Sequence, residues 1–130
     1  MTTGDAQEWL VHAEGDLHYA RLGRSDPQAL RNLIVFHAQQ AIEKALKATL
    51  VQRQVEFPKT HDLAELTEIV EEAGMAWPVE FSQVLEFTPF ATQSRYPGFD
   101  DPIPEAEVAE AIALAEKVVL WAKQQVAKAG

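Results

Sequence analysis

The segment from Pro27 to about Gln54 constrains the fold most, because its helical pattern is uninterrupted and apolar on two faces. At about 100° per residue, one arc gathers mostly small side chains that allow close helix packing. A second arc carries larger aliphatic side chains. A helix that is apolar on two faces lies at the centre of a bundle or is buried in an oligomer. The first arc contains Leu30, Ile34, Ala38, Ala41, Ala45 and Ala48, and the second contains Val35, Ile42, Leu46 and Leu50.

The rest of the chain shows the same helical periodicity, and strand-like alternation is nearly absent. We therefore predict a single all-α domain over residues 1–130, an up-and-down bundle of four to five helices. The loop Arg95–Pro104 is predicted from its prolines and glycine. The other helices are expected from a cap at Asp5 to about Gly23, over His61–Ala73, from Pro78, and over about Pro104–Lys128.

Capping residues predict where the helices begin and end. Asp5, Asp26 and Thr60 each carry a side-chain oxygen suited to an N-cap. Pro27 would then occupy the first turn of the second helix. Gly74 is expected to end the third predicted helix.

Composition excludes several classes of function. With 130 residues, of which 47% are hydrophobic and 24% charged, the chain is globular and has room for one core. The absence of cysteine excludes disulfides, thiolate metal sites and cysteine nucleophiles. No signal peptide is recognisable, and no apolar stretch approaches the roughly 18 residues of a membrane span, so we expect a cytoplasmic protein. No metal-ligand spacing or glycine-rich phosphate loop indicates a cofactor.

The charge is unevenly distributed along the chain. A net charge of −9 opposes non-specific binding of nucleic acid by the whole surface. Residues 21–59 nevertheless hold seven Lys and Arg against three acids, whereas residues 60–116 hold one Arg against 13 acids. One segment can therefore meet an anion while the rest repels it. The alternative is that acidic helix faces simply keep the protein soluble.

A polar strip lies between the two apolar arcs of the central helix. Because burying an unpaired ammonium group costs several kcal/mol, this strip must meet acids, a ligand, or water in a groove. In one interpretation its lysines extend outward or pair with acids such as Asp62 or Glu65. In the other, the strip faces an anion. It consists of His37, Gln40, Lys44 and Lys47.

Three segments, in this order and at these intervals, resemble the HEPN domain family: FHAQQAIEKALKATL at 36–50, PKTHDL at 58–63 and TPFATQSRYPG at 88–98. The resemblance implies a four- or five-helix up-down bundle that often forms a homodimer. Genes for such domains frequently lie beside a gene for a minimal nucleotidyltransferase, as toxin–antitoxin or defence pairs. Many members are metal-independent ribonucleases, and others were proposed to bind nucleotides.

The resemblance also implies a catalytic arginine, and with a histidine of the polar strip added the catalytic candidates are His37 and Arg95. Ribonuclease members share an arginine followed four to six residues later by a histidine, and Arg95 is the matching arginine here. No histidine follows it at that spacing, so His37 or His61 would supply the proton chemistry. Metal-free RNA cleavage needs a base, an acid and a cation, and Arg95 or Lys44 would supply the cation. In a dimer, His37 of one chain would approach Arg95 of the other. Arg31 precedes His37 by six residues, but both positions lie on different sides of one helix.

Two non-catalytic interpretations remain open beside this one. In the first, the strip binds a nucleotide phosphate or RNA, and Tyr96 stacks on a base. The ligand-binding candidates are then Gln40, Lys44, Lys47, His61, Arg95 and Tyr96. In the second, the chain is an interaction module whose small-residue arc and apolar final helix support homodimerisation or docking of a nucleotidyltransferase. That final helix contains the run Val118, Val119, Leu120 and Trp121.

Overall fold

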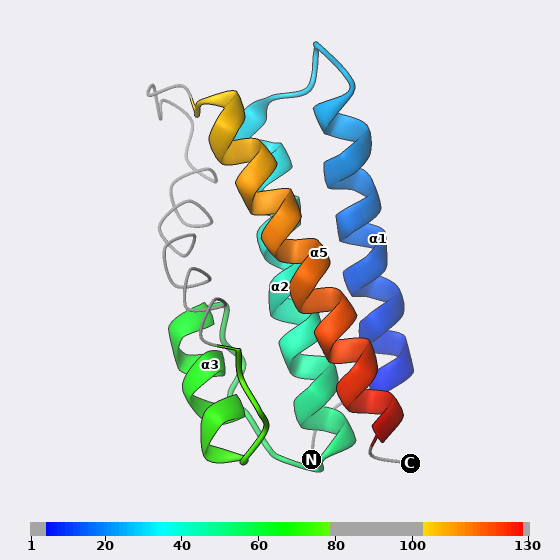
Figure 1. Ribbon diagram of the computed structural model, residues 1–130, viewed down its shortest axis with the longest axis vertical. Coiled ribbons are helices and arrows are strands. Elements are labelled where there is room, and N and C mark those ends of the chain that lie inside the picture. Colours follow the sequence, from blue (N-terminus) through cyan, green and yellow to red (C-terminus); the bar gives the residue numbers. More distant parts are fainter. Residues whose placement is uncertain (1–4, 79–102, 129–130) are drawn as a thin grey trace.

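The described part of the chain is built from helices. The computed structural model describes residues 5–78 and 103–128, and within these ranges it contains helices and no strand. Of the three long helices, the first runs antiparallel to the second and the last, which run parallel to each other, and a short helix packs near the end that holds both termini (Figure 1). The predicted all-α bundle is confirmed for this part of the chain. The described helices are α1 (Ala6–Arg24), α2 (Arg31–Gln52), α3 (Leu63–Glu72) and α5 (Glu105–Lys128).

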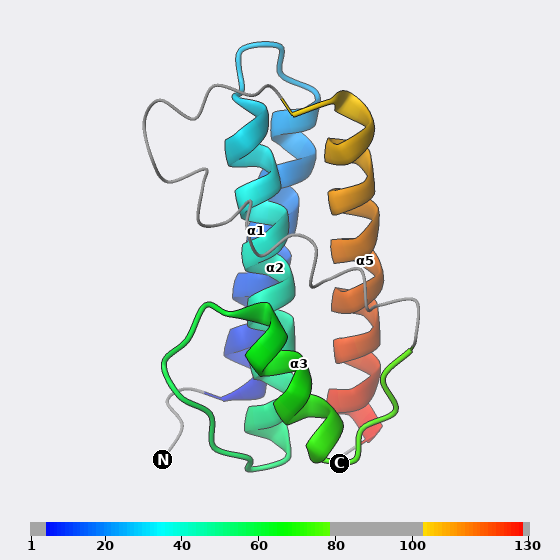
Figure 2. The same cartoon turned by 90° about the vertical axis from the view of Figure 1, so that its left-hand side faces the viewer.

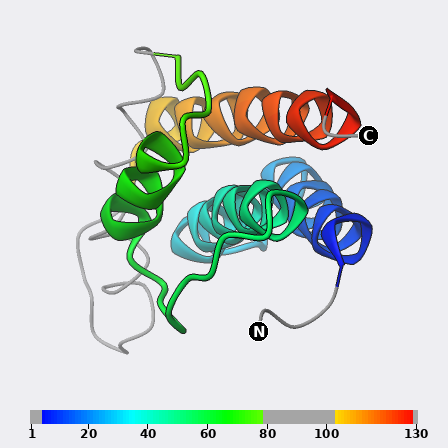
Figure 3. The same cartoon turned by 90° about the horizontal axis from the view of Figure 1, so that it is seen from below.

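Helix α2 is the centre of the bundle, as its two apolar arcs predicted. Seen end on, α2 lies between α1, α3 and α5 (Figure 3), and α3 crosses its lower half (Figure 2). Both arcs are buried from Ile34 to Leu50, because each faces a neighbouring helix. Leu30 is the exception: it precedes the helix and is 61% exposed.

The N-cap predicted for α1 is confirmed, and the one predicted for α2 is wrong. The Asp5 side chain accepts a hydrogen bond from the Glu8 backbone at 2.8 Å and caps α1. Asp26 instead accepts from the Gln28 backbone at 2.9 Å, within a turn that precedes the helix. Helix α2 therefore begins only at Arg31, and its N-cap position has no side-chain hydrogen bond. Because the Asp26 side chain bonds within this local turn, it does not cap α2.

The start of α3 is also shifted from its prediction, and its end is as predicted. Asp62 is the N-cap and accepts from the Ala64 backbone at 2.9 Å. Thr60 supports that cap, because its hydroxyl accepts from the Asp62 backbone at 3.0 Å. His61 consequently lies before the helix rather than in its first turn. Beyond α3, Gly74 adopts φ +83°, a left-handed conformation that suits glycine at a helix end.

Helix α5 is fastened to the rest of the bundle at both ends. Near its start, Arg31 donates to the Ile103 carbonyl at 3.0 Å. Near its end, the Trp121 indole donates to the Ala76 carbonyl at 2.9 Å and meets the Trp77 ring edge to face, with centroids 5.2 Å apart. The helix begins and ends where its pattern predicted. The helix expected from Pro78 and the loop around Arg95 lie outside the described residues.

Two glycines of α1 are expected to respond oppositely to alanine. A Cβ at Gly23 would lie 2.8 Å from Ile34 Cγ1, closer than real Cβ contacts, whereas nothing lies within 4 Å of one at Gly15. Overpacking outweighs helix propensity at the first site, so Gly23→Ala should lower the free energy of unfolding by about 1–2 kcal/mol. Gly15→Ala should raise it by roughly 0.5–1 kcal/mol. Thermal unfolding followed by circular dichroism measures both, and a Gly23→Ala variant that melts above the wild type would contradict the close α1–α2 approach.

Candidate functional site

The polar strip of α2 divides into two clusters, each built around a buried or half-buried acid. In the first, His37 Nδ1 lies 3.0 Å from Asp16 Oδ1, and Lys44 Nζ lies 2.6 Å from Asp16 Oδ2. Asp16 comes from α1, so one carboxylate joins α1 to two positions of α2. The Asp16 side chain is 12% exposed, against 26% for Lys44 and 38% for His37. The cation and the imidazole therefore face outward, and the acid lies behind them.

Aromatic rings complete this first cluster. The Tyr19 ring is stacked on the His37 imidazole at 5.6 Å between centroids, with 30° between the planes. Phe36 meets the same imidazole edge to face at 5.7 Å. We name Asp16, Tyr19, Phe36, His37 and Lys44 the Asp16 cluster. Because Asp16 holds Nδ1, the tautomer that donates Nδ1–H to the carboxylate leaves Nε2 as the basic atom of the imidazole.

The second cluster surrounds the carboxylate of Glu43. Lys47, one turn further along α2, donates to Glu43 Oε2 at 2.9 Å, and both side chains are at least nine-tenths buried. His61 Nδ1 lies 3.1 Å and 3.0 Å from the two Glu43 oxygens. The Lys47 ammonium also lies 5.5 Å and 5.9 Å from the ring centroids of Trp9 and Phe57. We name these five residues the Glu43 cluster. Its ammonium group is enclosed by its own chain.

The lysines therefore pair with acids, but with acids other than those suggested by the sequence. Lys44 and Lys47 meet Asp16 and Glu43, whereas Asp62 is occupied as the cap of α3. Sequence reasoning named neither acid. Asp16 is separated from Lys44 by 28 residues. One feature of the sequence could have indicated Asp16 as a partner: it precedes Leu17 and so lies at the edge of the buried face of α1.

The remaining candidates are placed as follows. Gln40 is half-buried on α2. Arg31 and His37 contact different neighbours, Ile103 and Asp16, as their six-residue separation predicted. Arg95 and Tyr96 lie outside the described residues. Within the described ranges, no three His, Asp or Glu side chains gather as metal ligands, and no helix is long and apolar enough to cross a membrane.

Comparisons with known proteins agree with this architecture. The family model of the HEPN domain matches residues 6–125. A crystal structure of an archaeal HEPN homologue superposes with a TM-score of 0.75 at 25% sequence identity, and the match covers 95% of this chain and 99% of that chain. No curated protein matches this sequence.

Proposed function

Since this chain belongs to the HEPN domain family, we propose that it is the nucleotide- or RNA-binding component of a nucleotidyltransferase-associated pair of the toxin–antitoxin or defence type. The partners in this proposal are a minimal nucleotidyltransferase and a second copy of the chain. The Asp16 cluster and Gln40 contact the nucleic acid. Arg95 and Tyr96 contribute from the segment outside the described residues.

The exposed Tyr19 ring carries this proposal. Tyr19 is 64% exposed and lies on the His37 imidazole, so one ring face is supported by protein while the ring itself is open to solvent. Aromatic side chains on which bases stack are the common element of single-strand binding sites. Beside it, Lys44 gives one of its three N–H groups to Asp16, and two remain for a phosphate.

The electrostatics of the cluster predict how the ligand is held. Asp16 neutralises Lys44, and the chain carries a net charge of −9, so the site is not a strongly positive surface. Affinity must then come from stacking and directed hydrogen bonds. Since few phosphates are neutralised, binding should depend only weakly on salt concentration.

Binding of a short fluorescent single-stranded RNA, followed by anisotropy, tests the proposal. Each stacked base contributes about 1–3 kcal/mol, so Tyr19→Ala should weaken binding by roughly 5- to 150-fold. His18→Ala is the matched control, because His18 is the neighbouring exposed ring on the same helix. Equal affinities for Tyr19→Ala and the wild type, or an equal loss for His18→Ala, would contradict the proposed site.

A second candidate function, metal-independent RNA cleavage, is favoured by the Asp16–His37 contact. A carboxylate on one imidazole nitrogen fixes the orientation and tautomer of the ring, and the other nitrogen is then the one that can accept a proton. In this candidate, His37 Nε2 removes the proton of a ribose 2′-hydroxyl and the 2′-oxygen attacks the adjacent phosphorus. The 5′-oxygen then leaves with a proton from a second acid. Lys44 or Arg95 stabilises the charge that develops on the phosphate.

A further inference from the structure

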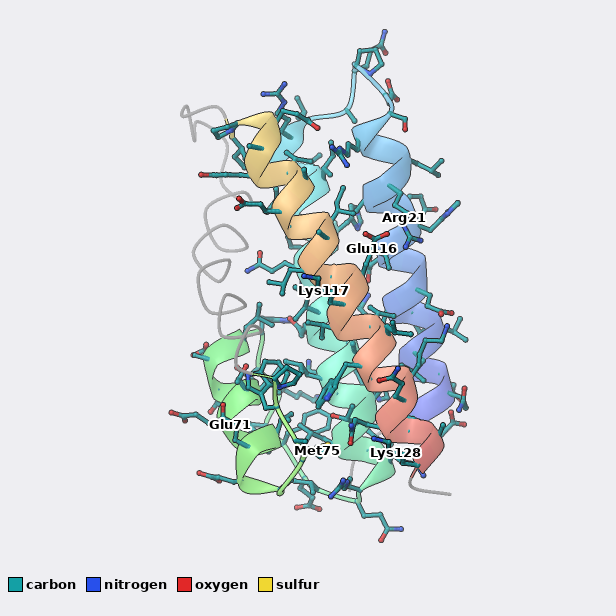
Figure 4. The ribbon with its side chains drawn as sticks, in the orientation of Figure 1. Arg21, Glu71, Met75, Glu116, Lys117 and Lys128 are labelled. Carbon is teal, nitrogen blue, oxygen red and sulfur yellow. The ribbon has the colours of Figure 1, made fainter. Side chains whose placement is uncertain are left out.

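Among the described residues, three ion pairs join the antiparallel helices α1 and α5: Arg24–Glu105 near the start of α5, and two further pairs along the outer face that the helices form. Arg21 donates through Nε and Nη2 to Glu116 Oε2, at 3.0 Å and 2.6 Å. Figure 4 shows these two side chains reaching toward each other across the face. Lys123 donates to Glu14 Oε1 at 2.5 Å. All four side chains are about half exposed, so the pairs lie on the surface.

The two helices present the same charge order. On α1 an acid at Glu14 is followed seven residues later by Arg21, and on α5 Glu116 is followed seven residues later by Lys123. Between the helices lies a groove of about 410 Å³. Leu120, which is 57% exposed, lines it. The apolar floor of the groove is formed by Leu17 and Val119.

We propose that this α1–α5 face binds the same face of a second copy, with α5 antiparallel to the α5 of the partner and Leu120 beside the partner's Leu120. The inference rests on the homodimer in the proposed function, and it adds which face forms that dimer. Charge complementarity supports this contact. On both helices an acidic residue is followed two turns later by a basic one. A two-fold rotation therefore places each acidic residue of this face opposite a basic residue of the second copy.

The helix rise gives the register. At about 1.5 Å per residue, Glu116 and Lys123 lie roughly 5 Å on either side of their midpoint, which is level with Leu120. Antiparallel packing about that midpoint brings Glu116 level with the partner's Lys123, and Lys123 level with the partner's Glu116. Both groups retain bonding capacity. Arg21 occupies only Oε2 of Glu116, and Glu14 occupies one of the three N–H groups of Lys123.

The size of the face suits such a dimer. Helix α5 has 24 residues. Helix α1 has 19 residues, so at about 1.5 Å rise per residue and a diameter of roughly 10 Å the two helices side by side offer roughly 650 Å². Stable interfaces bury about 800 Å² per partner. Each Leu120 would leave solvent and enter the groove beside the partner's α5, which gives the contact an apolar centre with a charged rim.

Light scattering after gel filtration tests the face. The wild type at micromolar concentration should have about twice the chain mass of 14.5 kDa, and Leu120→Lys should have the single mass. Leu30→Lys is the matched control, because Leu30 is 61% exposed and precedes α2 at the end of the bundle away from the termini. It should remain dimeric. Circular dichroism verifies that both variants stay folded. A monomeric wild type, or a dimeric Leu120→Lys, overturns the proposal.

Cross-linking gives an independent readout, because the chain contains no cysteine. Leu120→Cys should form a disulfide-linked dimer under mild oxidation, and Leu30→Cys should form little. A dimeric wild type whose Leu120→Cys variant is not cross-linked overturns this face and leaves the homodimer of the proposed function intact. Failure of RNA binding is measured separately at Tyr19, so the two proposals fail independently.

Discussion

Replacing Glu43 by alanine is expected to lower the free energy of unfolding by about 3–5 kcal/mol, the usual cost of removing one partner from a buried ion pair. The physical reason is the ammonium group that stays behind. Lys47 is 6% exposed, and without Glu43 its charge would remain buried beside the Trp9 and Phe57 rings without the carboxylate that pairs with it. Because His61 also bonds to this carboxylate, its contact is lost as well. Urea denaturation followed by circular dichroism measures the change.

The control is a Glu–Lys pair on the surface. Glu14→Ala removes the acid from Lys123, where both side chains are about half exposed, and should cost less than about 1 kcal/mol. The double variant Glu43→Leu/Lys47→Met removes both buried charges at similar volume and should recover most of the loss. If Glu43→Ala were no less stable than Glu14→Ala, the buried pair would contribute nothing beyond a surface contact.

The second large effect is expected in RNA cleavage. If the wild type cleaves RNA in the presence of EDTA, His37→Ala should reduce the rate at least about 100-fold, the lower end of general acid–base contributions. Asp16→Asn should also lower the rate, because the amide no longer offers a carboxylate to Nδ1. Its RNA affinity should change less than its rate, since Tyr19 is untouched. Gel analysis of a labelled RNA measures the rates, with His18→Ala as the control.

The outcomes separate the two candidate functions. A His37→Ala variant that cleaves as fast as the wild type would remove His37 from the catalytic assignment. A wild type that binds RNA and does not cleave it would rule out the ribonuclease candidate and support the binding component. Cleavage that Tyr19→Ala abolishes together with binding, and His37→Ala abolishes without loss of binding, would support both roles in one site.

The helices of the described residues and the central place of α2 could be predicted because they depend on periodicity, which is local. Asp5 was predictable as a cap for the same reason. Asp26 was not, because a turn to Gln28 competes for its side chain. Thr60 and Asp62 are both good capping residues, and the structure uses Asp62 for the helix and Thr60 to hold Asp62.

In the candidate site the sequence predicts the lysines that need partners, but not the acids that pair with them. The sequence shows that Lys44 and Lys47 lie on a mostly buried helix and need partners. It does not show which acids meet them, because Asp16 is brought there by the α1–α2 packing. Glu43 belongs to the same helix as Lys47 at a favourable four-residue spacing, yet its burial under His61 depends on the path of the α2–α3 connection. The ligand-contact roles all stay predictions, namely those of Gln40, Lys44, Lys47, His61, Arg95 and Tyr96.

The attachment of α3 has a consequence for hydrogen exchange. A helix of 10 residues is too short to be stable alone, so α3 persists only while its buried face and the His61–Glu43 contact hold it on α2. Helix α2 is instead packed against α1, α3 and α5 along both of its apolar arcs. The amides of α3 are therefore expected to exchange through local opening, while those in the middle of α2 wait for global unfolding. The amides of α3 would thus show lower protection from hydrogen exchange than those of α2, and Glu43→Ala would lower the protection of α3 first.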